Sequence, residues 1–450
     1  MGETKTESGT ETPTPKSKDW RDVLKALGNP RVLMVLLIGF GSGLPFLLTG
    51  NTFGMWLREY DISLTMIGFL SWVGLAYSFK FLWAPIIDRM DAPVFGKLGR
   101  RRGWMALSQV LVGLSLGAMA LIGPGNLTAL GIAAVVVAFA SATQDIAVDA
   151  WRVEAAENDE DLGLLTAAFQ LGYRFAILAA NSLILFVAAG IGWDGAYGVY
   201  GVLMGLALLA TLSVREPAPV AGQTEKLPQI WTLSGLFDSI AGPFIAFFRT
   251  HGALALLMLA AISLYRLPDF VMGPMVGPFY VDLGITKEAV GAARLSFGLV
   301  GTLIGIAAAG ISALKLGFGR TLLLGAILGP GSNLAYTALA FYGSGGGPLF
   351  FATLFVENFS EGFAGAALVA YMSSLTSLGY TATQYALLSS FYALLGKFLK
   401  GFSGQVVETL QVSYDLLPAY ALFFAGTAVV GIPAFVFCLI LNKRTKAQPA

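Results

Sequence analysis

Apolar runs of about twenty residues recur along this chain, separated by short polar breaks. A helical run of that length crosses a hydrocarbon layer of roughly 30 Å, and we expect about twelve such crossings. The expected spans are 31–56, 64–87, 104–123, 127–150, 162–190, 194–214, 252–280, 287–311, 319–342, 347–374, 381–408 and 416–441. Because 56% of the residues are hydrophobic and 12% are charged, the sequence predicts an all-α membrane protein.

Lysine and arginine gather in two short loops. The loop after the second span carries Arg89 and Arg100–Arg102, and the loop after the eighth carries Lys315 and Arg320. Short basic loops stay on the cytoplasmic side of a membrane. With an even number of spans, the basic loops and both chain termini are expected on that side.

A polar segment near the middle of the chain separates two groups of six spans. Two six-span halves joined by a linker are typical of the major facilitator fold, in which pseudo-symmetric halves enclose a central site. The expected parts are a polar, partly disordered tail (1–30), an N-terminal six-helix bundle (31–214), a cytoplasmic linker with an amphipathic helix (215–250), a C-terminal six-helix bundle (251–442) and a basic tail (443–450).

The fourth span ends in "SATQDIAVDAW", Ser141–Trp151, with two carboxylates in an apolar helix. Asp145 and Asp149 are four residues apart, so both project from one helix face, with Gln144 beside them. Two like charges at this spacing repel each other, which favours uptake of a proton by one of them. We expect Asp145 to face a central cavity, whereas Asp149 is expected either in the proton path or in a cytoplasmic gate.

The tenth span repeats this pattern in "FVENFSEG", with Glu357 and Glu361 four residues apart. Glu357 is the candidate proton site of the second half because apolar residues and Asn358 surround it. Glu361 is a candidate for substrate binding, since the nearby Gly362 and Gly365 suit close helix packing or a substrate wall.

The seventh span contains "LYRLPDFVMGPMVGPF", in which three prolines interrupt helix regularity. Broken helices free backbone groups and tend to line cavities in transporters. We therefore place Arg266 among the substrate-binding candidates and Asp269 among the proton-coupling candidates. The alternative is that these two side chains, three residues apart, satisfy each other.

Basic side chains within the spans have two expected roles. Arg174 in the fifth span and Lys397 in the eleventh are expected to neutralise the acids or hold an anionic substrate. Lys80 and Arg294 lie nearer span ends, where a long side chain reaches the interface.

Four further charged residues lie where spans approach the basic loops. The candidates for a cytoplasmic gate are Asp88, Arg89, Arg101 and Arg152.

Several functions are disfavoured by the composition. The net charge of +1 and the lack of a basic-aromatic motif argue against nucleic-acid binding. The sequence contains one cysteine, Cys438, and one histidine, His251, so it has no Cys/His cluster with metal-ligand spacing. Neither a Walker loop nor a nucleophile-base pattern appears, so we expect no enzyme and no cofactor. Active transport would then use an ion gradient, and the membrane carboxylates favour protons.

Several motifs resemble one known family. "GFGSGLPFLLTGNTFGMWL", "IGFLSWVGLAYSFKFLWAPIIDR", "GRRRGW" and "SATQDIAVDAWR" are similar to motifs of the AmpG-type muropeptide permeases of the major facilitator superfamily. "LYRLPD", "FVENFSEG" and "TATQYALLSSFYALLGK" extend this resemblance through the second half. Glu361 departs from it, because a small residue is expected there.

The resemblance implies a proton-driven importer of N-acetylglucosaminyl-1,6-anhydro-N-acetylmuramyl peptides in the inner membrane of a Gram-negative bacterium. Such import serves cell-wall recycling and feeds β-lactamase induction, and so antibiotic resistance; the expected partners are the substrate and the lipid bilayer, with the protein a monomer. Two alternatives stay open: a related transporter of another anionic solute such as acetyl-CoA, and a non-transporting membrane assembly factor on the same fold.

Overall fold

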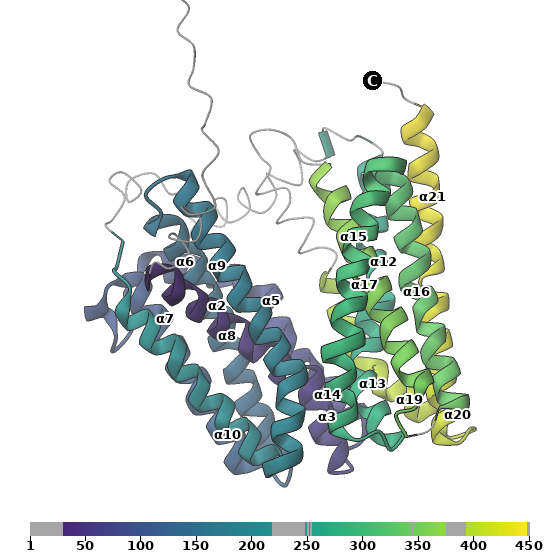
Figure 1. Cartoon of the computed structure of the whole chain (residues 1–450), viewed down its shortest axis with the longest axis horizontal. Helices are drawn as coiled ribbons and strands as arrows, with labels where there is room; N and C mark the ends of the chain where they lie inside the picture. The colour runs from purple at the N-terminus through teal and green to yellow at the C-terminus, as the bar shows by residue number, and fades with distance from the viewer. Residues whose placement is uncertain are drawn as a thin grey trace, which may run out of the picture.

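The computed structural model describes residues 30–217, 248–249, 252, 254–343, 345–374 and 393–447. Within these ranges the chain is helical and contains no strand. Figure 1 shows two helical bundles that meet at one end, around α3, α13, α14 and α19, and diverge towards the other. The predicted all-α fold is confirmed.

The first bundle contains long helices and several short ones. Its elements are α2 (Pro30–Leu48), α3 (Asn51–Glu59), α4 (Leu64–Leu70), η1 (Ser71–Leu75), α5 (Ala76–Phe79), η2 (Lys80–Leu82), α6 (Ala84–Arg89), η3 (Gly96–Leu98), α7 (Arg100–Ile122), α8 (Leu127–Ala155), α9 (Asp159–Leu178), η4 (Ala179–Leu183) and α10 (Ile184–Ser213).

The second bundle has the same alternation of continuous and interrupted helices. Its elements are α12 (Leu254–Tyr265), α13 (Leu267–Asp282), α14 (Lys287–Ala293), η5 (Arg294–Gly298), α15 (Leu299–Leu316), α16 (Phe318–Tyr342), α17 (Pro348–Ser374), η6 (Lys400–Phe402), α19 (Ser403–Gln411), α20 (Leu416–Val430) and α21 (Ile432–Ala447). Residues 393–399 are also helical and lead into η6.

Eight helical segments of the described chain are long and apolar enough to cross a membrane. One of them, Asp161–Ser213, has 53 residues, and a straight helix of that length would measure about 80 Å. It contains a kink at Gly192, whose φ of 78° suits a residue without a side chain, so it makes two crossings. Of the other expected crossings, the second is divided into shorter helices, the tenth is the continuous helix α17, which carries Glu357 and Glu361, and the eleventh lies partly outside the described residues.

Two interruptions lie at positions that matter for function. The break in the seventh span is at Arg266, between α12 and α13, with Pro268 in the first turn of α13. In the first span, α2 continues through Pro45. The break follows at Gly50, which has non-helical φ and ψ values of −117° and −118°.

Some expected segments fall outside the described residues. These are the tail up to residue 29, the linker from 218 to 247 with its amphipathic helix, and the first part of the eleventh span up to residue 392. At the C-terminus, α21 continues as far as Ala447, so part of the segment expected as a basic tail is helical.

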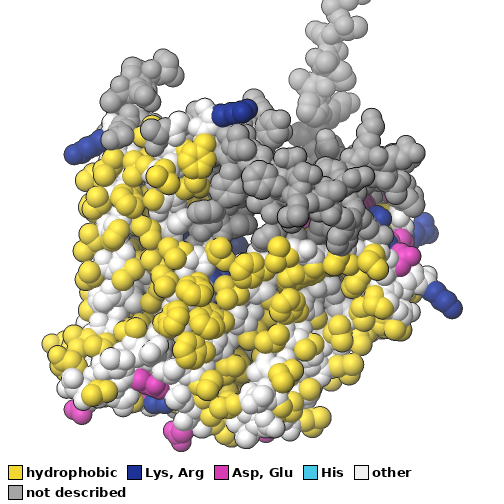
Figure 2. All heavy atoms as spheres, turned by 180° about the vertical axis from the view of Figure 1, so that it is seen from behind, with side chains coloured by type: hydrophobic (Ala, Val, Ile, Leu, Met, Phe, Trp, Pro, Cys, Tyr) yellow, Lys and Arg dark blue, Asp and Glu magenta, His cyan; other side chains and the backbone are white. Residues whose placement is uncertain are grey.

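We call the end that carries Arg101 and Lys315 the basic end, and the opposite end the far end. At the far end, ion pairs join the two bundles: Arg58 Nε lies 2.7 Å from Asp282 Oδ1, and Lys287 Nζ lies 2.7 Å from Glu59 Oε2. Figure 2 shows apolar side chains over the flank, with many charged side chains towards the two ends. Such a belt suits contact with lipid.

Candidate functional site

In the first bundle, α8 places Gln144 and Asp145 against α2. The Gln144 side chain is buried and donates from Nε2 to Ser42 Oγ at 3.2 Å. Gln144 Oε1 and Asp145 Oδ1 are buried and have no hydrogen-bond partner among the described residues. Buried polar atoms are usually paired, so these two acceptors mark a position where a proton or a substrate donor would be stabilised.

Lys80 provides the nearby positive charge. We expected this side chain to reach the interface, but it lies close enough to act electrostatically on Asp145 without forming a direct ion pair. Asp145 therefore interacts electrostatically with a cation of the second span, as expected for a carboxylate inside the bundle.

Asp149 has a different environment, although it shares the helix face with Asp145. Its Oδ1 lies 3.2 Å from Arg152 NH2 on the same helix, and about half of its side chain is exposed. Arg152 also lies over the Phe169 ring, with its guanidinium carbon 4.9 Å from the ring centroid. This pair does not connect the two bundles.

In the second bundle, Arg266 joins two helices through its guanidinium. Its Nε lies 3.0 Å from Asp269 Oδ2 within α13, and its NH2 lies 2.9 Å from Glu361 Oε1 on α17. Arg266 and Asp269 therefore pair with each other as the alternative expects, but Arg266 also pairs with Glu361. Arg266 is positioned by the break between α12 and α13, which frees it from regular helix geometry.

Glu357 lies one turn from Glu361, in a region with two buried tyrosines. Asn358 donates from Nδ2 to Glu357 Oε2 at 3.1 Å. The hydroxyls of Tyr280 and Tyr336 are 2.8 Å apart, and both rings lie within electrostatic range of Glu357. This acid therefore lies beside hydroxyl and amide groups, and the Asn358 amide donates a hydrogen bond to it.

Arg294 also acts on Glu357, although we expected its side chain to reach the interface. The residue is only 7% exposed, and its NH1 donates to the backbone oxygen of Asn181 in η4 at 2.8 Å. It thus connects the second bundle to the first, a role that sequence position alone does not indicate.

The expected gate residues are partly brought together at the basic end. Arg101 pairs with Asp88 on one side and with Glu154 on the other, each at 2.6 Å. Arg152 belongs instead to the pair with Asp149, and the side chain of Arg89 lies outside the described part of the structure. The Arg101 cluster connects helices of the first bundle, so a role as a gate between the bundles remains a prediction.

Arg174 and Lys397, the two cations expected to neutralise the acids or hold an anionic substrate, have different surroundings. Arg174 is exposed on α9. Lys397 is half-buried and donates from Nζ to Ser78 Oγ of the first bundle at 2.9 Å. Lys400, which was not among the predicted site residues, is half-buried three residues later. Helical residues three apart share a face, so this spacing was the available signal.

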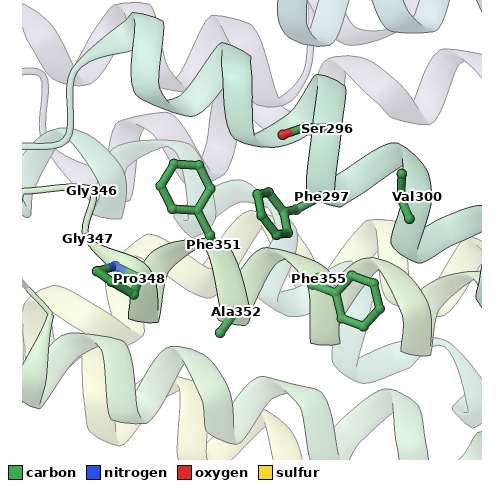
Figure 3. Close-up of a pocket in the computed structure, with 9 residues that line it drawn as sticks. All are labelled: Ser296, Phe297, Val300, Gly346, Gly347, Pro348, Phe351, Ala352 and Phe355. Atoms are coloured by element: carbon green, nitrogen blue, oxygen red, sulfur yellow. The ribbon is translucent and has the colours of Figure 1, made fainter.

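A cavity of about 810 Å³ lies between the η5–α15 segment and α17, and none of the predicted site residues lines it. Its lining is apolar apart from Ser296, and Phe297, Phe351 and Phe355 project around it (Figure 3). A charged ligand would lose its hydration there without compensating partners. The cavity therefore does not suit an anionic solute.

Together, the described side chains form two acid-cation groups, one in each bundle. Each group contains a carboxylate within reach of a cation from another span. Such groups change their charge when they take up a proton or meet an anion, so they suit the coupling of binding to movement of the bundles.

Comparisons with known proteins agree with this arrangement. The Major Facilitator Superfamily profile matches residues 35–399. The chain is 34% identical over 433 residues to the anhydromuropeptide permease of Escherichia coli (strain K12), which covers 94% of this chain and 83% of that protein. It is 29% identical over 430 residues to a putative transporter AmpG of Rickettsia felis, with 94% and 99% covered.

Among solved structures, the nucleoside transporter NupG superposes with a TM-score of 0.65 at 16% identity, covering 92% of this chain and 99% of that one. At such low identity the likeness shows the shared fold. Secondary transport on a multi-pass membrane fold thus accounts for the paired bundles and their internal charges. The chain belongs to the major facilitator superfamily and, within it, to the AmpG-type permeases.

Proposed function

We propose that the protein imports anhydromuropeptides from the periplasm to the cytoplasm across the inner membrane, driven by the proton gradient. The observation that carries the substrate assignment is the 34% identity, over 94% of the chain, to the anhydromuropeptide permease. The import supplies cell-wall recycling and, through it, the signal for β-lactamase induction. The protein works as a monomer in this proposal.

The orientation follows from charge. The basic end faces the cytoplasm, because short loops rich in lysine and arginine stay on that side. The ion pairs Arg58–Asp282 and Lys287–Glu59 then close the periplasmic side. In Figure 1 the bundles meet at this end and diverge towards the basic end.

Proton coupling is assigned to Asp145, Asp269 and Glu357. Arg266 is held by Asp269 and Glu361, so a proton on either acid weakens its hold on the guanidinium. The released guanidinium is then available to a carboxylate of the incoming peptide. Loss of the proton to the cytoplasm restores the original pairs and lowers the affinity for the substrate, which completes one transport cycle.

Uptake into proteoliposomes tests this function. The purified chain should accumulate labelled anhydromuropeptide when the outside is more acidic, and a protonophore should abolish the accumulation. Uptake of the labelled substrate without any response to the gradient would refute proton coupling. Uptake of acetyl-CoA in place of the muropeptide, or transport of neither solute, would refute the substrate assignment.

A further inference from the structure

Three lysine side chains lie together between the second and eleventh spans. Lys397 Nζ donates to Ser78 Oγ at 2.9 Å, which joins the two bundles. A Cβ atom placed on Gly74 would lie 3.2 Å from Lys400 Nζ, so this ammonium also rests against the second span. Lys397 acts electrostatically on Lys400, and Lys80 acts on Lys397. The three residues therefore form one cluster, which we call the lysine cluster.

Positive charge exceeds negative charge in the lysine cluster. Lys80 acts on Asp145, but within the described residues neither Lys397 nor Lys400 has a carboxylate at ion-pair distance. The segment 375–392, which leads into this helix, contains no Asp or Glu in its sequence. Like charges in a partly buried position are costly unless an anion meets them. Among the described residues, the two lysines of the second bundle therefore lack an anion that would compensate their charge.

An aromatic layer lies beside the lysine cluster on its far-end side. The Trp72 ring stacks on Phe398, with centroids 5.7 Å apart and planes 13° apart, and its Nε1 donates to the Phe398 backbone oxygen at 2.8 Å. Phe402 packs edge-on against Trp72 at 5.5 Å. These rings place apolar surface next to Lys397 and Lys400, between which Phe398 lies in the sequence.

We propose that Lys80, Lys397 and Lys400 bind carboxylate groups of the peptide part of the transported anhydromuropeptide. This inference rests on the proposed function and specifies which part of the substrate the cluster recognises. Because Lys80 and Ser78 belong to one bundle and Lys397 and Lys400 to the other, a bound carboxylate connects both halves. Its affinity consequently depends on how the halves are arranged.

The test compares two substrates that differ in charge. One is an anhydromuropeptide with free peptide carboxylates, and the other is the same molecule with those carboxylates amidated. The wild-type chain in proteoliposomes should transport the free acid with a kcat/KM at least about tenfold above that of the amide, because each charge-assisted contact favours the ionised ligand.

Lys400→Met should bring this ratio close to one by lowering transport of the free acid, with little change for the amide. Lys315→Met serves as the matched control, because this lysine is exposed at the basic end and its loss should leave the ratio unchanged. Gly74→Ala keeps every charge but crowds the Lys400 ammonium, so it should reduce the ratio to an intermediate value.

The outcomes distinguish carboxylate binding by the lysine cluster from the transport function itself. If the wild-type chain transports both substrates equally, or if Lys400→Met and Gly74→Ala leave the ratio unchanged, the lysine cluster does not read carboxylates and the transport function still stands. An equal loss for both substrates would assign the cluster a structural role instead. If the wild-type chain transports neither molecule, the proposed function fails together with this inference.

Discussion

The fourth and tenth spans carry acid pairs at the same spacing, yet the two pairs have different partners. In α17, Glu361 pairs with Arg266 of another span, and Arg266 also holds Asp269. In α8, Asp149 pairs with Arg152 of its own helix. A repeated sequence pattern therefore does not impose the same connections on the two halves. The second bundle contains an interhelical latch, whereas in the first the buried Asp145 Oδ1 has no hydrogen-bond partner among the described residues.

The largest expected effect comes from breaking the latch of the second bundle. Arg266→Met leaves Asp269 and Glu361 as unpaired, repelling carboxylates, and the charged contact to Asp269, whose side chain is 21% exposed, contributes about 1.5–3 kcal/mol by itself. Muropeptide uptake should fall at least about 100-fold. The control is the double variant with Asp269→Asn, which should recover membrane insertion but not uptake. Uptake near the wild-type level in Arg266→Met would show that the latch has no part in transport.

The next effect concerns the deeper acid of each pair. Asp145→Asn and Glu357→Gln remove a proton site while keeping a similar shape, so gradient-driven accumulation should fall about tenfold or more. Exchange of substrate across the membrane without a gradient should persist, because binding remains. The measurement is accumulation against counterflow in the same vesicles. If only one of the two variants loses accumulation, proton coupling belongs to one bundle.

A smaller effect is expected at Arg294, which connects the second bundle to the first. Arg294→Gln removes the contact to the Asn181 backbone oxygen and the positive charge near Glu357. Because this contact stabilises one arrangement of the bundles and does not hold the substrate, uptake should fall only several-fold. Arg294→Lys, which keeps the charge, separates the two contributions. Unchanged uptake in both variants would mean that this contact between the bundles is dispensable.

The smallest effect should come from the outer pair of the first bundle. Arg152→Gln removes a partner of Asp149, whose side chain is 52% exposed. Ion pairs three residues apart on one helix contribute about 0.2–0.5 kcal/mol, so uptake should change by about twofold or less. A loss as large as that of Arg266→Met would contradict the contrast between the two halves and favour a gating role for Asp149.

Much of the site was predictable because charge inside a membrane span is rare. Asp145, Asp269 and Glu357 stand out against apolar neighbours, and each lies inside a bundle as expected. The Arg266–Glu361 pair was not predictable, because its partners are 95 positions apart and the break at Arg266 aims the side chain. Lys400 was missed for a similar reason, since its neighbour Gly74 belongs to the other bundle.

By itself, the sequence determined the class of protein and its all-helical fold, because a lipid solvent requires long apolar helices and tolerates few charges. It also determined which ionisable residues needed a functional reason. Only the tertiary structure decided how those charges are paired, which cations lack a carboxylate within the described chain, and which end joins the bundles. Pairing depends on helix breaks and on contacts between distant spans, and hydropathy and residue spacing contain no information about either.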